Sequence, residues 1–598
     1  MRRRLALFGI LLVGAAALVG AAGWNDLSQA RAQLNEARRQ LSDIAADPAA
    51  LRTPEGRSAA RRELDGALQR IARARSRVID SRPIAATRIV PGFGRQRAGV
   101  LELVADARAG TEASRDLLRA VDDLAERTAL RDGAVPLDGL RELEGAVRTA
   151  GQRIEALPAP VDGLWGSLAD ARRRLNDVAA DTGTRLLNGA DALGAAQSFM
   201  GRDGPRRYFV AVQNNAEMRD QGMVLSFAVA RFEQGRLTVE RTGPIGELRL
   251  DGPVDVPLGS ESEAVFGHLQ PRQLWQSVNA GADFTWSART MLAMYRQATG
   301  QTVDGVIAID VRGLEALLRV VGAVTVAAHP EAISADNAAE VLLDDFYDLV
   351  PVGDQTFRKE RLGDVARAVV ARLTSGSHDA VALGRELGEA AAMGHFRLWS
   401  AVEAEEGVFE RTGLGGAIAA EMPDRTLHLS VQNATATKLD YHLRHRAKLD
   451  VYVSEVGTAV VRTQLTVRND APAGAAPSYQ LGPDGFNQER PGQYIGRIYF
   501  WGPRGAAQLQ SVPESGLTLN TAAVTVEPGG EEQSVVFETV IPTAVRDGRL
   551  ELRLVPQPTL VPYELEVVVH PEGWDLSGER RIETTWDRTL KLSWGLRR

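Results

Sequence analysis

The sequence predicts a multidomain chain: an N-terminal transmembrane helix, a helical bundle or stalk, a central α/β domain and a C-terminal β-sandwich-like domain. Three observations predict this order: an uncharged stretch near the N-terminus, a long region of helically spaced apolar residues, and many short alternating segments at the end. The 598 residues exceed one ordinary hydrophobic core, which also indicates several domains. We place the domains at residues 1–24, 25–198, 199–405 and 406–598.

The first residues predict an uncleaved signal-anchor. Three arginines precede an uncharged stretch from Leu5 to Trp24. Its 20 residues, at about 1.5 Å each, give roughly 30 Å, the thickness of a hydrocarbon core. The arginines predict a cytoplasmic N-terminus, so a single pass through the plasma membrane leaves the bulk of the chain extracytoplasmic. A cleaved signal peptide is the alternative, but no Ala-x-Ala site precedes a polar start.

Composition and standard motifs exclude several kinds of site. The net charge of −7, from 70 basic and 77 acidic residues, argues against a nucleic-acid partner. The absence of cysteine excludes disulfides, cysteine–metal sites and thiol nucleophiles. The sequence contains no P-loop, no H-E-x-x-H motif and no G-x-S-x-G motif.

Residues 25–195 carry a helical pattern. Apolar residues keep an a/d spacing from Leu27 to Ile44, and a second periodic stretch runs from Leu64 to Val78. Pro48 and Pro54 separate the two stretches. The pattern predicts a bundle or stalk that holds the next domain away from the membrane, and a partner-binding coiled coil is the alternative.

Strand and helix patterns alternate from Arg206 onward, which predicts helices packed on a mostly buried sheet. The expected strands are Arg207–Gln213, Met223–Phe232, Arg236–Arg241, Val303–Ile309 and Val324–Ala328. The expected helices are Ser287–Thr299, Val311–Val320, Ala335–Leu349, Phe357–Leu373 and Ala380–Ala404.

Strands separated by Gly/Pro turns dominate the last third of the chain and predict the β-sandwich-like domain. The expected strands are Thr426–Val431, Lys448–Val453, Val460–Val467, Tyr494–Phe500, Leu517–Val526, Ser534–Val540, Leu550–Leu554 and Tyr563–Val569.

A polar cluster, VQNNAEMRDQG, stands between the first two strands of the α/β domain. Its candidate site residues are Asn214, Asn215, Glu217, Arg219 and Asp220. Such a cluster is either a turn or a site. Its carboxylates, Glu217 and Asp220, are the candidates for binding Mg²⁺, which would neutralise a transferring phosphate.

A second polar cluster begins the helix expected at 357–373. Arg358, Arg361 and Asp364 fall on one helical face, followed by Arg367. Two arginines on one face can hold a phosphate or pyrophosphate by bidentate bonds. The alternative is a set of exposed salt bridges, which is what charge runs usually form.

The stretch RRYFVAVQNNAEMRDQGMVLSFAVARFEQGRLTV is similar to the signature of bacterial envelope proteins that carry the domain of unknown function 4012. ADFTWSARTMLAMYRQATGQTVDGVIAIDVRGLEALLRVVGAVTV and RKERLGDVARAVVARL resemble the same family, in the same order. The N-N-x-E-x-R motif is fairly specific, and the resemblance covers roughly residues 83–503.

The middle segment also looks distantly like LytR–CpsA–Psr envelope proteins. Members of that family transfer glycopolymers from a polyprenyl-pyrophosphate lipid to peptidoglycan, with Mg²⁺ and arginines around the pyrophosphate. The likeness implies that Arg219, Arg358 and Arg361 contact an anionic ligand. The chain departs from that pattern at Gln221, where the family has an aspartate, and at Gly243–Gly246, where it has Pro-Arg-Asp.

Two functional hypotheses follow. In the first, the protein is a non-catalytic envelope protein that binds an anionic lipid-linked or glycan ligand through Asn214, Asn215, Arg219, Arg358 and Arg361, with the bilayer and possible envelope proteins as partners. In the second, it is a Mg²⁺-dependent phosphotransferase that attaches a glycopolymer from polyprenyl-pyrophosphate to the cell wall, with Arg219, Glu217 and Asp220 as catalytic candidates. The departures at Gln221 and Gly243–Gly246 favour the first hypothesis.

Overall fold

The computed structural model describes residues 24–46, 50–81, 93–127, 129–131, 133–327, 329–348, 355–485, 488, 490–506 and 511–598. The expected anchor falls on residues 1–23, outside the described residues, and stays a prediction. Within the described ranges no helix combines the length and the apolar character that a membrane span needs. The chain divides into two units, one of Met1–Ala129 with Pro136–Gln197 and one of Leu130–Val135 with Ser198–Arg598.

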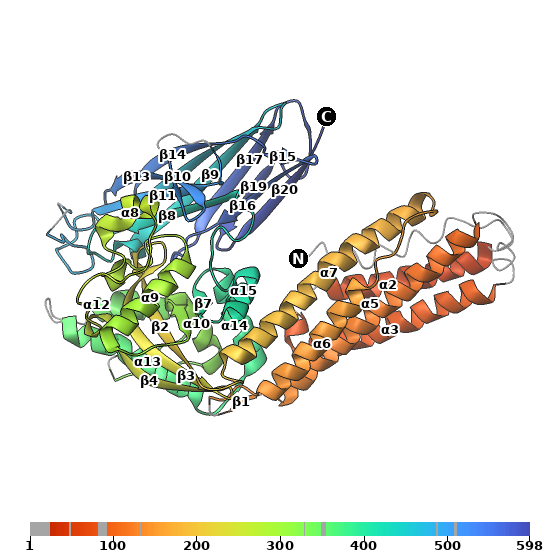
Figure 1. Cartoon of the computed structure of the whole chain (residues 1–598), viewed down its shortest axis with the longest axis horizontal. Coiled ribbons are helices and arrows are strands. Elements are labelled where there is room, and N and C mark those ends of the chain that lie inside the picture. Colours follow the sequence, from red (N-terminus) through yellow and green to blue (C-terminus); the bar gives the residue numbers. More distant parts are fainter. Residues whose placement is uncertain are drawn as a thin grey trace. The chain divides into compact units, whose positions relative to one another are not determined.

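The first unit is helical, as predicted (Figure 1). Its helices are α2 (Trp24–Ala46), η2 (Ala50–Arg52), α3 (Pro54–Asp80), α5 (Phe93–Arg127), α6 (Leu137–Glu155) and α7 (Gly166–Phe199). Thr53 begins α3, because its side-chain oxygen accepts a hydrogen bond from the amide of Gly56 at 3.1 Å, and Pro54 fixes the first turn. Small residues such as Ala37, Ala67 and Ala74 are fully buried between the helices.

The second unit begins with a mixed five-stranded sheet in the order β4-β3-β2-β5-β7. Its strands are β2 (Arg206–Met218), β3 (Gly222–Glu233), β4 (Arg236–Pro244), β5 (Gly305–Ile309) and β7 (Phe396–Ser400). The central strands β2 and β5 run parallel, whereas the other neighbours are antiparallel. Gln234 and Gly235 both adopt positive φ between β3 and β4, the geometry of a primed hairpin turn.

Helices flank this sheet, and the predicted α/β domain is confirmed in outline. They are η4 (Ile245–Glu247), α8 (Ser260–Phe266), η5 (Gly267–Leu269), η6 (Trp275–Ser277), α9 (Phe284–Thr299), α10 (Val311–Val321), α11 (Ala338–Glu340), the π-helical turn η7 (Val341–Asp345), α12 (Phe346–Asp348), α13 (Gln355–Thr374), α14 (Ala380–Ala392) and α15 (Glu403–Thr412). Two short strands, β1 (Ala129–Arg131) and β6 (Ser377–Asp379), pair with each other.

Two element predictions in this domain are wrong. The expected helix Ala380–Ala404 ends at Ala392, because Gly394 turns the chain with φ of 83° and the next residues form the edge strand β7. Of the expected strand Val324–Ala328, residues 324–327 are described, and they form only a single bridge between Val324 and Ile333. In both places the apolar pattern was too short to separate strand from helix or loop.

The C-terminal region is strand-rich, as predicted. Its elements are β8 (Thr426–Asn433), η8 (Leu439–His442), β9 (Leu443–Val453), β10 (Ala459–Asn469), β11 (Tyr494–Gly502), β12 (Val512–Glu514), β13 (Leu517–Val526), β14 (Glu531–Ile541), β15 (Val545–Arg546), β16 (Arg549–Val555), β17 (Tyr563–Pro571), β18 (Asp575–Ser577), β19 (Arg581–Trp586) and β20 (Leu590–Arg597). They form one sheet in the order β14-β10-β9-β17-β19 and another in the order β12-β13-β11-β8-β16-β20-β18. A single core unites inward side chains of both sheets, among them Leu449, Val567 and Leu552.

A buried histidine in this core predicts a loss of stability in acid. Neither ring nitrogen of His445 has a hydrogen-bond partner among the described residues, and the ring packs edge-on against Tyr563 at 4.6 Å. Burial lowers the pKa of His445 from 6.5 to about 3. Since the unfolded chain takes up this proton near pH 6.5 and the folded chain does not, folding stability falls as pH drops from 6.5 towards 3. At pH 4 we expect a loss of about 3 kcal/mol relative to pH 7.

Urea unfolding of His445→Leu at pH 7 and pH 4 measures this effect. The variant is expected to lose less stability between the two pH values than the wild-type chain. His268→Leu, at an exposed position, serves as the matched control and should follow the wild type. An equal acid loss in His445→Leu and wild type would show that other groups dominate.

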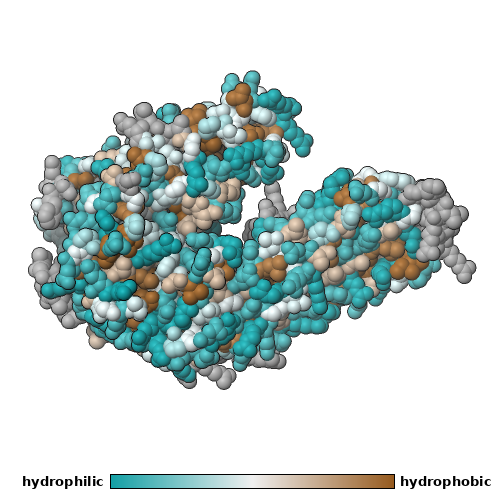
Figure 2. Space-filling model, viewed as in Figure 1, coloured by the Kyte–Doolittle hydropathy of each residue, from teal (hydrophilic) through white to brown (hydrophobic). Residues whose placement is uncertain are grey.

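The visible surface is mainly hydrophilic, and its hydrophobic residues form small separate groups (Figure 2). Such scattered groups are ordinary for a folded protein.

Candidate functional site

The two faces of the central sheet are covered unequally. On one face, Phe209 and Ala211 of β2 are fully buried and pack with Met291 and Tyr295 of α9. On the other face, Val210 and Val212 are only half-buried, although β2 is a central strand with neighbours on both sides. Because successive side chains of a strand point to opposite faces, this second face is apolar but incompletely filled.

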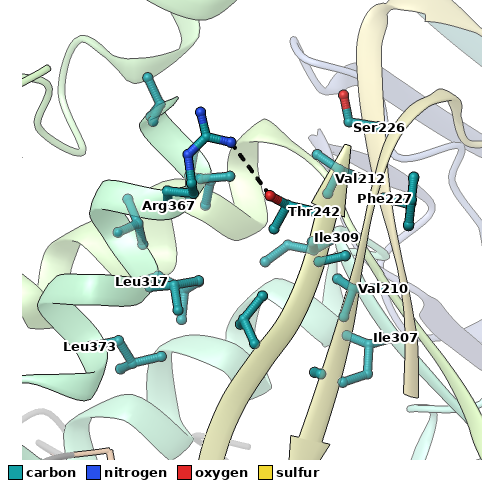
Figure 3. A pocket seen from close by; sticks show the side chains of 18 of the residues that line it. Val210, Val212, Ser226, Phe227, Thr242, Ile307, Ile309, Leu317, Arg367 and Leu373 are labelled. Carbon is teal, nitrogen blue, oxygen red and sulfur yellow. Dashed lines mark hydrogen bonds between the residues drawn. The ribbon is translucent and has the colours of Figure 1, made fainter. Parts of the chain in front are cut away.

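A cavity of about 490 Å³ occupies the space between this second face and the helices α10, α13 and α14 (Figure 3). This volume is in the range of roughly 300–1,000 Å³ that small-molecule sites have. The sheet side of its wall includes Val210, Val212, Ala228, Ile307 and Ile309. The helix side includes Leu314, Leu317, Val365, Val369 and Leu373.

The cavity has one polar and one apolar end. At the level where the pairing of β2 with β5 ends, the wall carries Ser226 and Asn214. One level below, Thr242 accepts a hydrogen bond from Arg367 at 3.4 Å (Figure 3). The opposite end is lined by apolar residues that include Val135 and Leu237. The carboxyl ends of parallel strands are where α/β sheets commonly bind ligands.

Arg367 stands at the rim of the polar end. Its side chain is 53% exposed and forms an ion pair with Asp364 on the preceding turn of α13. The predicted ligand residues Arg358 and Arg361 also belong to α13, but their side chains lie outside the described residues. Their proposed role in ligand binding stays a prediction.

The VQNNAEMRDQG stretch is mostly strand rather than turn. β2 continues to Met218, and the chain reverses only over Arg219–Gln221, where the amide of Arg219 donates to the carbonyl of Gln221 at 2.8 Å. Asn214 lines the cavity, and its amide group donates to the hydroxyl of Tyr347 at 3.0 Å. Asn215 donates to Asp310 at 2.9 Å and to the carbonyl of Pro558 at 3.1 Å.

The two carboxylates of the stretch are buried against basic side chains. Glu217 pairs with Lys438, and the ammonium group of Lys438 also lies over the rings of Tyr347 and Tyr479, at 5.7 and 5.2 Å. Asp220 contacts Nε2 of His428 at 2.6 Å. Lys438 and His428 both come from the C-terminal strand-rich region.

Arg219 also connects the turn after β2 to the strand-rich region. The guanidinium donates to the carbonyl of Asn433 at 2.7 Å, and the carbonyl of Arg219 accepts from Gln557 at 2.7 Å. Burial lowers the pKa of Arg219, and the nearby carboxylate of Asp440 opposes this shift. Gln221 accepts from Gln213 at 2.9 Å, a neutral pair inside the chain.

Asp440 forms the centre of the buried polar groups beneath this turn. It accepts hydrogen bonds from Asn433 at 2.8 Å, from the amide of Met218 at 3.2 Å and from Tyr494 at 3.3 Å. Burial raises the pKa of Asp440 to about 7, although these hydrogen bonds and Arg219 lower it. The VQNNAEMRDQG stretch therefore connects the α/β domain to the strand-rich region.

The structure thus brings Asn214, Asn215, Glu217, Arg219 and Asp220 together, but nearly all of their contacts are internal. Only Asn214 lines the cavity. The described residues contain no group of three or more histidines and carboxylates able to hold a metal ion. Glu217 and Asp220, the candidate Mg²⁺ ligands, face cationic or imidazole groups of the chain itself.

Sequence reasoning found the helix of Arg367 but missed the cavity. The sequence pattern named Arg367 only as the end of a charge cluster. The available signal was that Val365, Val369 and Leu373 repeat every four residues, which places an apolar stripe beside Arg367 on one helix.

Comparison with known proteins gives a family match. Residues 203–347 match the family model described as "Protein of unknown function (DUF4012)", which confirms the resemblance predicted from the sequence over this segment. The part of the predicted resemblance outside this segment stays a prediction. No curated protein matches the chain. One solved structure, from Legionella pneumophila, is described as a "putative nutrient binding protein"; it is 10% identical, covers 29% of this chain and 70% of its own, and has a TM-score of 0.18, too low to support an argument.

Proposed function

We propose that this chain, whose residues 203–347 carry the domain of unknown function 4012, is a non-catalytic, membrane-anchored protein of the cell envelope that binds an anionic lipid-linked ligand. The observation that supports the proposal is the apolar cavity of about 490 Å³ with Arg367 at its rim. In this cavity, the apolar face of β2 and β5 would contact the lipid part of the ligand, and the polar end would contact its anionic group.

The half-buried apolar face of β2 favours a ligand with an apolar body. Protein interiors are packed with few voids larger than a water molecule, because an empty cavity forfeits contacts among its lining atoms. The wall of this cavity is formed largely by aliphatic side chains on both sides, among them Val210, Ile307, Leu317 and Leu373. A ligand with an apolar body regains these contacts and removes its own apolar surface from water.

The transferase alternative receives no such support. A Mg²⁺-dependent phosphotransferase needs carboxylate oxygens that can reach the metal ion. Glu217 is engaged with Lys438, and Asp220 is engaged with His428. Gln221, at the position of an acidic residue in the LytR–CpsA–Psr pattern, is bonded to Gln213. We therefore restrict the proposal to binding.

A substitution that fills the cavity tests the proposal. Ala228 lies in the middle of the sheet wall, so Ala228→Trp is expected to occupy the space of the ligand. The measurement is displacement of a fluorescent fatty-acid probe from the purified full chain, below the critical micelle concentration. We expect binding by wild type and at least a tenfold loss of affinity in Ala228→Trp.

Val456→Trp is the matched control, because Val456 is 82% exposed in the strand-rich region, and it should bind as wild type does. Thermal unfolding confirms that each variant is folded. A folded Ala228→Trp variant with wild-type affinity, or a wild-type chain that binds no probe, contradicts the proposal.

A further inference from the structure

The size of the cavity and its two unlike ends narrow the chemical class of its ligand. We propose that it holds a single-chain amphiphile of about 16 carbons, with its negatively charged head at Arg367 and its tail towards Val135 and Leu237. This inference rests on the proposed function, which it makes more specific: one acyl or alkyl chain rather than a long polyprenyl chain or a two-chain lipid.

The volume sets the chain length. A methylene group takes up about as much space as a water molecule in the liquid, roughly 30 Å³. The 490 Å³ of the cavity divided by 30 Å³ gives about 16 such groups. A two-chain phospholipid of ordinary length brings twice this number, and a long polyprenyl chain brings several times as many. The two-chain lipid would leave about half of its methylene groups outside the cavity, and the polyprenyl chain would leave most of its carbons outside.

The residues at the two ends set the orientation. The end near Val135 and Leu237 offers apolar side chains, and a charged head buried there would lose its hydration without a partner. At the other end the guanidinium of Arg367 is half exposed, and Thr242 is hydrogen-bonded to it. A ligand anion at this rim gains a charge-assisted hydrogen bond while it keeps contact with water.

The two carboxylates that line the cavity near its polar end already have partners within the chain. Glu247 lines the cavity near Thr242, and its carboxylate pairs with Arg241 at 3.2 Å. Asp310 also lines the cavity at the ends of the strands, but its carboxylate is bonded to His395 at 2.6 Å and to Asn215 at 2.9 Å. Asp364, the partner of Arg367, is itself nearly half exposed, so a ligand anion can compete with it.

A chain-length series tests the length. The purified full chain is titrated with straight-chain carboxylates of 8 to 24 carbons and with a long polyprenyl phosphate, each in competition with the fluorescent probe. We expect affinity to rise roughly fourfold per methylene, from about 0.8 kcal/mol for each buried group, and to level off near 16 carbons. Ala230→Leu, which adds three carbons to the wall towards the apolar end, should move this plateau to shorter chains.

An affinity that keeps rising to 24 carbons, or a polyprenyl phosphate that binds more tightly than hexadecanoate, overturns the inference and leaves the proposed function intact. If none of the carboxylates and no polyprenyl phosphate binds to the protein, the proposed function itself is refuted. Val456→Leu, at an exposed position, is the control for Ala230→Leu and should leave the plateau unchanged.

The head position is tested separately with a surface variant that does not disturb the core. Arg367→Gln should weaken hexadecanoate about tenfold and leave the uncharged hexadecanol unchanged, because only the carboxylate loses its partner. Equal weakening of both ligands, or of neither, overturns the placement of the head at Arg367.

Discussion

Replacing Lys438 with methionine lowers the free energy of unfolding by about 3–5 kcal/mol, because it leaves the carboxylate of Glu217 buried without a cation. Methionine keeps much of the length and apolar contact of the lysine side chain, so the loss reports the missing charge rather than a cavity. Urea unfolding at pH 7 measures it as a lower midpoint with an unchanged slope.

The double variant Glu217→Leu/Lys438→Met separates charge from packing. Since buried ion pairs can often be exchanged for apolar residues at little cost, this variant should regain most of the lost stability. Lys591→Met is the matched control; Lys591 is 55% exposed and pairs with Glu421, and its loss should cost under about 1 kcal/mol. A stability of Lys438→Met within about 1 kcal/mol of wild type would mean that Glu217 does not depend on this partner.

A chain that ends at Ala420 is expected to lose the cooperative unfolding of its α/β domain. This end keeps α15 and removes the strand-rich region, and with it His428, Asn433 and Lys438, which bond the turn after β2. It also exposes apolar side chains such as Phe266, whose ring packs on Tyr499 at 5.2 Å. Calorimetry of residues 25–420 against 25–598 measures the difference.

The helical unit is present in both chains and serves as the internal reference for this experiment. Its unfolding transition should persist in residues 25–420, while the transition of the α/β domain disappears or falls by more than about 10 °C. If the α/β domain unfolds at the same temperature in both chains, the polar contacts with the strand-rich region add nothing to the stability of the α/β domain.

The sequence predicts an element well where its apolar residues recur with the period of a strand, two residues, or of a helix, about 3.6 residues. The predicted strand Leu517–Val526 has the same bounds as β13. The predicted helix Val311–Val320 differs from α10 by one residue; its ends were predictable because Asp310 caps the helix and Gly322 follows it. β19 was missed, since Arg581–Trp586 carries charged and threonine side chains with little apolar alternation.

The candidate site was harder to predict than the fold. The polar residues of VQNNAEMRDQG were correctly recognised as unusual, but their partners, such as Lys438 and Pro558, lie hundreds of residues later in the chain. No local pattern reveals such a partner. The cavity is equally hidden, because a half-buried Val210 and a fully buried Phe209 look alike in a sequence.

The hydrogen bond between Asn215 and Pro558 can form only late in the synthesis of the chain. The two residues are 343 positions apart, and at about 5–20 residues per second the ribosome needs roughly 20 to 70 s to travel from one to the other. During that interval Asn215 lacks this partner, whereas His428 and Lys438, the partners of Asp220 and Glu217, are made earlier in it. We therefore expect the α/β domain to complete this contact only when the last fifteenth or so of the chain is being made.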